Sequence, residues 1–166
     1  MRRIALFLLL TSILCNGQEL HWENNQSLEF KCHAGQSISL IKIQLDINHK
    51  DLTWEFGCKG TFDSGADCVL SPQVNESNQT FAYECPPHHV LSGMSSYLSS
   101  QLEDRRWQFY CCRNNRRCTD KCEWITNVNG FEFFNVPDQK YLVGAESYSE
   151  KADRRWKYKY CSVVQC

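Results

Sequence analysis

The most informative segment of the sequence reads Asp104-Arg105-Arg106-Trp107-Gln108-Phe109-Tyr110-Cys111, and it returns as Asp153-Arg154-Arg155-Trp156-Lys157-Tyr158-Lys159-Tyr160-Cys161. A weaker copy, Asp51-Leu52-Thr53-Trp54-Glu55-Phe56-Gly57-Cys58, lacks the arginine that follows the aspartate in the other two. The three tryptophans are 53 and 49 residues apart. Self-similarity at a fixed period is the signature of repeated structural units, so the sequence predicts three copies of about 50 residues each.

The pattern inside each copy is that of a β-strand. Trp107, Phe109 and Cys111 alternate with Gln108 and Tyr110, and period-two alternation with aromatic enrichment indicates half-buried strands. Clusters of Gly, Asn, Asp and Ser at 63–65 and 127–130 indicate turns between them. The predicted fold is all-β, a single disulfide-rich domain of three pseudo-repeats with approximate threefold symmetry. A β-prism and a β-trefoil both fit this description.

Residues 1–17 have the features of a secretory signal peptide. Arg2 and Arg3 precede an uncharged, mostly apolar run from Ile4 to Cys15, and small residues follow at the expected cleavage site. The apolar run has 12 residues, which is shorter than the roughly 20 that a membrane-spanning helix needs. We therefore expect a secreted protein without a membrane span, whose single domain covers residues 18–166.

The cysteines indicate the same compartment. Ten remain after residue 17, and an even number behind a signal peptide predicts a disulfide framework. The alternative is a zinc site, because Cys118 and Cys122 have a ligand-like spacing. No second pair with that spacing completes such a site, so we expect neither a metal nor a cofactor.

The position of each cysteine relative to its tryptophan predicts two kinds of bridge. Cys58 and Cys111 lie four residues after their tryptophans, whereas Cys112 and Cys161 lie five after, on the opposite face of a strand. One kind of bridge joins two cysteines of the same copy, and the other kind joins a copy to a flanking segment of the chain. The expected pairs are Cys32–Cys58, Cys118–Cys166, Cys122–Cys161, Cys85 with Cys111 or Cys112, and Cys68 with whichever of Cys111 and Cys112 remains.

Three sequons for N-linked glycosylation begin at Asn25, Asn75 and Asn78. An acceptor of this kind is expected in a surface loop of a secreted protein. The sequence therefore predicts a glycoprotein with these three asparagines on its surface.

Charge is distributed unevenly along the chain. Residues 18–100 carry a net charge of −6 (4 Lys and Arg, 10 Asp and Glu), and residues 101–166 carry +3 (12 and 9). A nucleic-acid-binding domain is basic overall, so this class is excluded. Two basic clusters predict a surface for sulfated or uronic polysaccharides, because arginine binds anionic groups in bidentate fashion. The first comprises Arg113, Arg116, Arg117 and Lys121, and the second comprises Lys151, Arg154, Arg155, Lys157 and Lys159.

The motif residues have two interpretations. The pairs Asp104-Arg105 and Asp153-Arg154 form either ligand sites or structural ion pairs beside a packed tryptophan, and we favour the structural role because each copy repeats it. The only histidine pair, His88-His89, is interpreted as a loop feature. No motif of a hydrolase, metalloprotease or P-loop enzyme occurs, so we expect no enzymatic activity.

The segment from Asp104 to Arg113, continued by Arg117-Cys118 and Cys122, resembles the dermatopontin family, as does its echo from Asp153 to Trp156. The Asp-Arg-x-Trp repeat with a vicinal cysteine pair carries this resemblance, which covers nearly all of residues 18–166. It implies a secreted extracellular matrix or cell-adhesion protein that binds proteoglycans, glycosaminoglycans or cell-surface glycans. The family also includes invertebrate agglutinins, so the alternative it implies is a lectin-like agglutinin in innate defence. Other matrix proteins are further partners, and oligomerisation stays open.

Overall fold

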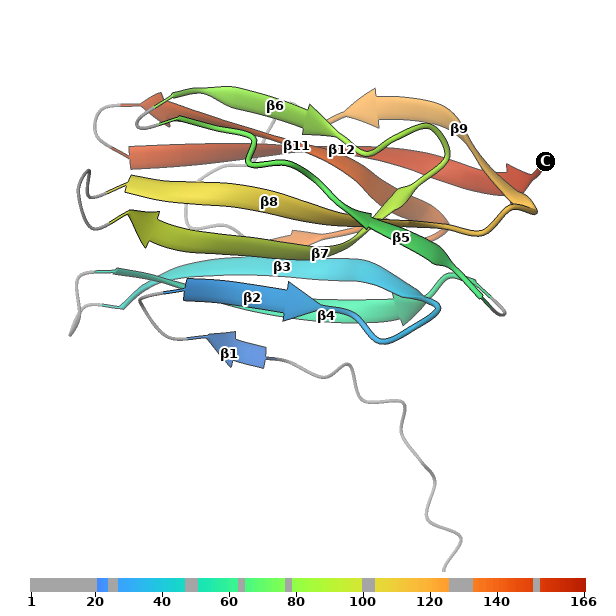
Figure 1. Cartoon of the computed structure of the whole chain (residues 1–166), viewed down its shortest axis with the longest axis horizontal. Helices are drawn as coiled ribbons and strands as arrows, with labels where there is room; N and C mark the ends of the chain where they lie inside the picture. Colours follow the sequence, from blue (N-terminus) through green and yellow to red (C-terminus); the bar gives the residue numbers. More distant parts are fainter. Residues whose placement is uncertain are drawn as a thin grey trace, which may run out of the picture.

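The computed structural model describes residues 21–23, 27–46, 51–62, 65–76, 79–99, 104–125, 133–150 and 153–166 (Figure 1). These residues form twelve β-strands and no helix, so the predicted all-β class is confirmed. The strands are β1 (His21–Glu23), β2 (Ser27–Lys31), β3 (Gln36–Asp46), β4 (Asp51–Gly60), β5 (Asp67–Leu70), β6 (Phe81–Glu84), β7 (Val90–Ser99), β8 (Asp104–Arg113), β9 (Arg117–Trp124), β10 (Phe133–Asn135), β11 (Lys140–Glu150) and β12 (Asp153–Gln165). The predicted signal peptide lies outside the described residues, which include no helix that is long and apolar enough to cross a membrane.

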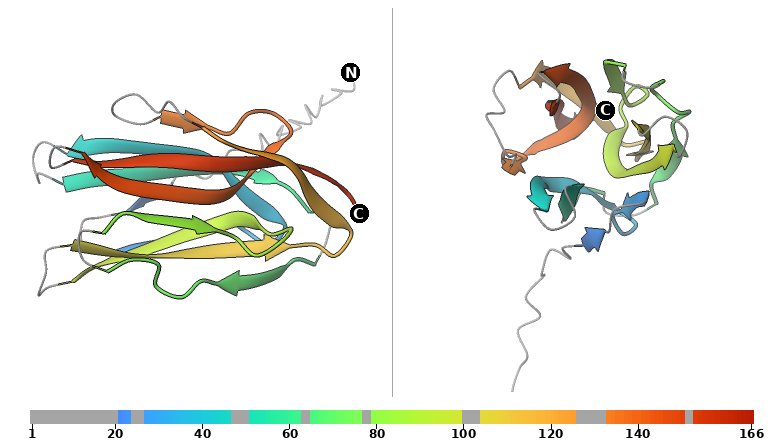
Figure 2. Two further views of the ribbon diagram at one scale, coloured as in Figure 1. Left: turned by 90° about the horizontal axis from the view of Figure 1, so that it is seen from above. Right: turned by 90° about the vertical axis from the view of Figure 1, so that its left-hand side faces the viewer.

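The strands form three antiparallel four-stranded sheets. Sheet A has the order β1-β4-β3-β10, sheet B the order β2-β7-β8-β5 and sheet C the order β6-β11-β12-β9. Each sheet combines a central hairpin with the strand that opens the same copy and one strand from another copy. The described strand order therefore repeats three times, and Figure 2 shows the sheets grouped around one centre when seen from the end. A threefold axis, and the choice between a β-prism and a β-trefoil, stay predictions.

The three repeat tryptophans meet in the main core. Trp54, Trp107 and Trp156 are 3%, 1% and 2% exposed. Their ring centroids are 5.1 Å (Trp54–Trp107), 5.3 Å (Trp54–Trp156) and 4.7 Å (Trp107–Trp156) apart, within the range at which aromatic rings attract one another. Trp107 and Trp156 are therefore packed tryptophans, as the structural interpretation of the motif predicts. Because each tryptophan comes from a different hairpin, their contact joins the three sheets.

The three hairpins also begin and bend alike. A turn precedes each of them, and the third residue of the turn has a positive φ: Gly35 (81°), His88 (64°) and Gln139 (60°). The strand pairing inside each hairpin then slips by one residue, after Ile38, Leu91 and Leu142 respectively. Such bulges bend a strand and increase its twist, so each hairpin curves around the core at the same point.

Five disulfides cross the structure. They are Cys32–Cys58, Cys68–Cys112, Cys85–Cys111, Cys118–Cys166 and Cys122–Cys161. Cys85, for which the sequence left two partners open, is bonded to Cys111, and Cys68 is bonded to Cys112. Neighbouring residues of a strand point to opposite faces, so the vicinal pair on β8 reaches one partner on the core side and another on β5.

Candidate functional site

The arginine of the repeated motif binds a serine of its own hairpin. Arg105 Nη1 donates to Ser96 Oγ at 3.1 Å, and Arg154 Nη1 donates to Ser147 Oγ at 3.1 Å. In the strand register, each serine lies directly opposite the tryptophan of its copy. This arrangement supports the structural interpretation of the motif. The side chains of Asp51, Asp104 and Asp153 lie outside the described part of the chain.

The first basic cluster lies around the β8–β9 turn, at the end of the molecule where the chain ends (Figure 1). Arg117 N donates to Asn114 O at 2.9 Å to close the turn, and Cys166 N donates to Arg116 O at 3.1 Å. Arg116 and Lys121 are exposed and Arg113 is half-buried. Within the described residues, no carboxylate forms an ion pair with these three side chains. The turn therefore presents cationic groups to solvent.

Two of the five cations in the second predicted cluster form ion pairs on the outer face of sheet C. Lys157 Nζ lies 3.3 Å from Glu146 Oε1, and Lys159 Nζ lies 2.8 Å from both carboxylate oxygens of Glu84. Arg154 is bound to Ser147, Arg155 is half-buried, and Lys151 lies outside the described residues. The role of Lys157 and Lys159 in polyanion binding stays a prediction, and the fold supplies each of them with a counter-charge.

Lys59 is another cation whose role is in the fold. Its Nζ donates to Lys140 O at 2.5 Å and lies 4.5 Å from the centre of the Tyr141 ring. Burial lowers the pKa of the Lys59 ammonium, and the nearby Asp138 carboxylate opposes this shift. The contact ties β4 of sheet A to the first residues of β11, so Lys59 adds little to the exposed basic surface.

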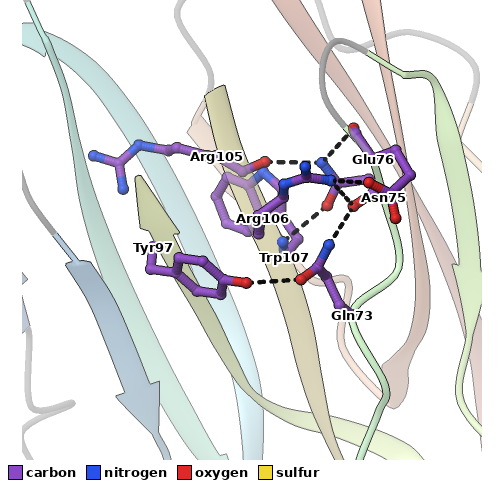
Figure 3. A network of polar contacts seen from close by, with 7 residues as sticks. All are labelled: Gln73, Asn75, Glu76, Tyr97, Arg105, Arg106 and Trp107. Atoms are coloured by element: carbon purple, nitrogen blue, oxygen red, sulfur yellow. Dashed lines mark hydrogen bonds and ion pairs between the residues drawn. The ribbon is translucent and has the colours of Figure 1, made fainter. Parts of the chain in front are cut away.

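A polar network that the sequence did not predict surrounds Asn75, which is 4% exposed. Trp107 N donates to Asn75 Oδ1 at 2.9 Å, and Asn75 Nδ2 donates to Arg105 O at 2.8 Å (Figure 3). The side chain thus pairs with the edge of β8 as a neighbouring strand would. The prediction of a surface position for Asn75 is wrong, because the nitrogen that would carry a glycan is buried and donates to the backbone. Asn25 and Asn78 lie outside the described residues.

The network continues to the surface of sheet B. Arg106 Nη1 donates to Asn75 O and to Glu76 Oε2, both at 2.8 Å. Gln73 Nε2 donates to Asn75 O at 2.9 Å, and Tyr97 Oη donates to Gln73 Oε1 at 2.7 Å. Figure 3 shows Tyr97 and Glu76 at opposite ends of this chain of contacts. Sequence reasoning missed Gln73 and Tyr97, because neither belongs to the repeated motif and they are 24 residues apart.

The histidine pair lies in the turn before β7, in agreement with a loop position. Thr119 N donates to His88 Nδ1 at 3.1 Å, so this ring nitrogen is an acceptor that joins the turn to β9. The described residues contain no group of three or more His, Cys, Asp or Glu side chains placed to hold a metal ion.

Comparison with known proteins matches these features to one family. The sequence model of the Dermatopontin family matches residues 23–166. The chain is 32% identical over 154 residues to the hemagglutinin/amebocyte aggregation factor of Limulus polyphemus, covering 87% of this chain and 89% of that protein. It is 36% identical over 141 residues to dermatopontin of Biomphalaria glabrata (82% and 95% covered) and 26% identical over 153 residues to dermatopontin of Homo sapiens (86% and 76%).

No solved structure matches the chain. The family match covers both complete copies of the Asp-Arg-x-Trp motif, the weaker first copy and all ten cysteines of the five disulfides. The matched range therefore contains the repeat, the vicinal cysteines and nearly all of the described strands. The chain belongs to the dermatopontin family.

Proposed function

We propose that this chain is a secreted, non-enzymatic protein of the extracellular matrix or cell surface that binds anionic glycan chains of proteoglycans. Extracellular adhesion or a lectin-like role is the common ground of the relatives it resembles. The observation that carries the finer proposal is the β8–β9 turn, where Arg113, Arg116 and Lys121 have no acidic partner among the described residues. The lysines of sheet C, in contrast, are already paired.

The turn is suited to a polyanion because it is held in one shape. The disulfide Cys118–Cys166 fixes the chain end against it, and Arg116 N donates to Asn114 Oδ1 at 2.9 Å. A rigid backbone limits the ordering cost of binding to the side chains themselves. Arginine and lysine on such a support attract sulfate and carboxylate groups along a glycan chain, and the attraction is screened by salt.

The test is retention on immobilised heparin. We expect the wild-type protein to bind at low salt and to elute as salt rises, because the Debye length is only about 8 Å at physiological ionic strength. The variant Arg116→Glu/Lys121→Glu should elute much earlier with an unchanged melting temperature, since exposed charges contribute under about 0.5 kcal/mol to stability. The matched control Lys157→Gln/Lys159→Gln should elute close to wild type. Flow-through of the wild type at low salt would refute the proposal.

A second candidate function is that of a lectin-like agglutinin. The observation that favours it is the similarity to the Limulus polyphemus factor, whose name describes hemagglutination and cell aggregation. Agglutination requires at least two binding sites in one chain or one assembly. Red-cell agglutination that a free sugar inhibits, by a protein that heparin does not retain, would favour this function over the first.

A further inference from the structure

The ring of Tyr97 is open to solvent, although its hydroxyl group forms a hydrogen bond within the protein. Tyr97 is 47% exposed, and its Oη donates to Gln73 Oε1 at 2.7 Å. Tyr97 lies on β7, whereas Gln73 belongs to the segment that runs along the far edge of β8. Adjacent strands are about 4.8 Å apart, so the phenol must extend across β8 to reach its partner. The ring therefore lies along the sheet and turns one face outward.

The polar groups beside the ring are fixed and balanced in charge. Arg106 is the register partner of Tyr97, and its guanidinium binds Glu76 Oε2 at 2.8 Å. The Arg106 side chain is 10% exposed and that of Glu76 is 72% exposed, so the carboxylate is the part of the ion pair that a ligand meets. Gln73 is also exposed, and its amide nitrogen and amide oxygen each form a hydrogen bond that fixes the side chain.

The other sheets provide an internal comparison. Tyr148 holds the same place in sheet C, because Tyr97 and Tyr148 each follow the serine that faces the repeat tryptophan. Lys157 Nζ lies 4.8 Å from the centre of the Tyr148 ring and also pairs with Glu146. In sheet A the corresponding residue is Gln44. Among these three equivalent positions, Tyr97 is the tyrosine over whose ring the described part of the chain places no lysine.

We infer that Tyr97, Gln73 and Glu76 form a shallow binding site for the ring of a neutral pyranose sugar in a glycan. The apolar C–H face of such a ring stacks on an aromatic face, and the carboxylate and amide oxygens accept hydrogen bonds from its hydroxyl groups. An exposed carboxylate disfavours a sulfated chain, so this site has a different ligand class from the β8–β9 turn. Arg113 lies seven positions after Arg106 on β8, which places the two sites about 23 Å apart along the strand.

The experiment is binding of the intact secreted protein to immobilised neutral oligosaccharides that end in galactose, glucose, mannose or N-acetylglucosamine, with heparin on the same surface. We expect wild type to bind at least one neutral glycan in a salt-resistant way. Tyr97→Ala should weaken this binding about tenfold, the value of an aromatic contact. The matched control Tyr148→Ala should bind as wild type does. Heparin retention should be the same for all three proteins.

Glu76→Gln keeps a hydrogen-bond acceptor for Arg106 and serves as a second variant if Tyr97→Ala folds poorly. It should weaken neutral-glycan binding several-fold in a protein that still folds, because a charge-assisted hydrogen bond to the sugar becomes a neutral one. Absence of neutral-glycan binding by wild type would overturn the inference, and so would equal binding by Tyr97→Ala or a folded Glu76→Gln. If wild type binds neutral glycans but not heparin, the proposed proteoglycan function is refuted and the inference about this site is not.

Discussion

The first and second copies of the repeat place a tryptophan in the same core by different contacts. Trp54 faces Ile43 across its hairpin, whereas Trp107 faces Ser96, which accepts a hydrogen bond from Arg105. The third copy repeats the arrangement of the second with another arginine–serine pair. Arginine and serine thus occur together in two copies and are both missing from the first. This joint occurrence indicates that the pair is a unit of the fold.

The outer edges of the two hairpins differ as well. In the first copy β1 covers β4, and Glu23 is the register partner of Trp54. In the second copy, side chains take the place of a neighbouring strand along β8. Trp107 N donates to Asn75 Oδ1 and Phe109 N donates to Ser71 Oγ, both at 2.9 Å. Buried N–H groups must be paired wherever they occur. The core therefore determines where the tryptophans lie, and each copy pairs its strand edge with the groups that its own sequence provides.

The largest expected effect tests the core position that the tryptophans of both copies share. Trp54→Ala and Trp107→Ala should each destabilise the protein by about 3–5 kcal/mol, a large share of the stability of a typical domain. We expect little or no secreted protein from either variant, and an early unfolding midpoint in urea for any that is recovered. Trp124→Ala, at a half-buried position on β9, is the milder control. A first-copy variant that unfolds like wild type would break the equivalence of the two copies.

The next effect concerns the edge that the second copy closes with side chains. Asn75→Ala leaves Trp107 N and Arg105 O buried without partners and should cost about 2–3 kcal/mol in the free energy of unfolding. Ser77→Ala removes the same sequon without changing the asparagine, so its urea midpoint should equal that of wild type.

Enzymatic removal of N-glycans in heavy-oxygen water should leave Asn75 unlabelled in the secreted protein. A labelled aspartate at this position would show that the folded network tolerates a glycan, and would contradict the structural role of the asparagine.

A smaller effect converts the second copy into the first. Arg105→Leu and Ser96→Ile should each destabilise the protein by about 1 kcal/mol, because each removes one partner of a charged hydrogen bond. In the double variant the two costs should not add, with a coupling of at least about 0.5 kcal/mol. Urea denaturation of the four proteins measures this cycle. Strict additivity would mean that the arginine and the serine act separately.

The smallest effect lies in the turns that precede the hairpins. Gln139 has a φ of 60° where the first copy has Gly35 at 81°. Glycine adopts this conformation without strain, so Gln139→Gly should raise stability by about 0.5–1 kcal/mol. Gly35→Ala should lower stability, because the added Cβ would lie 2.9 Å from Phe62 O. Thermal melts of the two variants should shift in opposite directions, and a shift of both in the same direction would contradict equivalent turns.

Local pattern was sufficient for much of the fold. Alternation around Trp54, Trp107 and Trp156 predicted strands because side chains of a strand alternate between its two faces. The phase of each cysteine relative to these tryptophans placed Cys111 and Cys112 on opposite faces for the same reason, but it left open which of them pairs with Cys85. The buried tryptophans, the all-β class and the family resemblance all follow from these short-range regularities.

The candidate sites depended on contacts between distant segments. Whether Lys157 and Lys159 are available to a ligand depends on Glu84 and Glu146, which reach them only when β6 and β11 pair beside β12. Asn75 matches a glycosylation sequon in sequence, yet its amide pairs with β8 in the folded chain. Short-range pattern encodes which face of a strand a residue occupies. Availability of a charge, an amide or an aromatic face depends on which other strand packs beside it, and only the assembled sheets specify that.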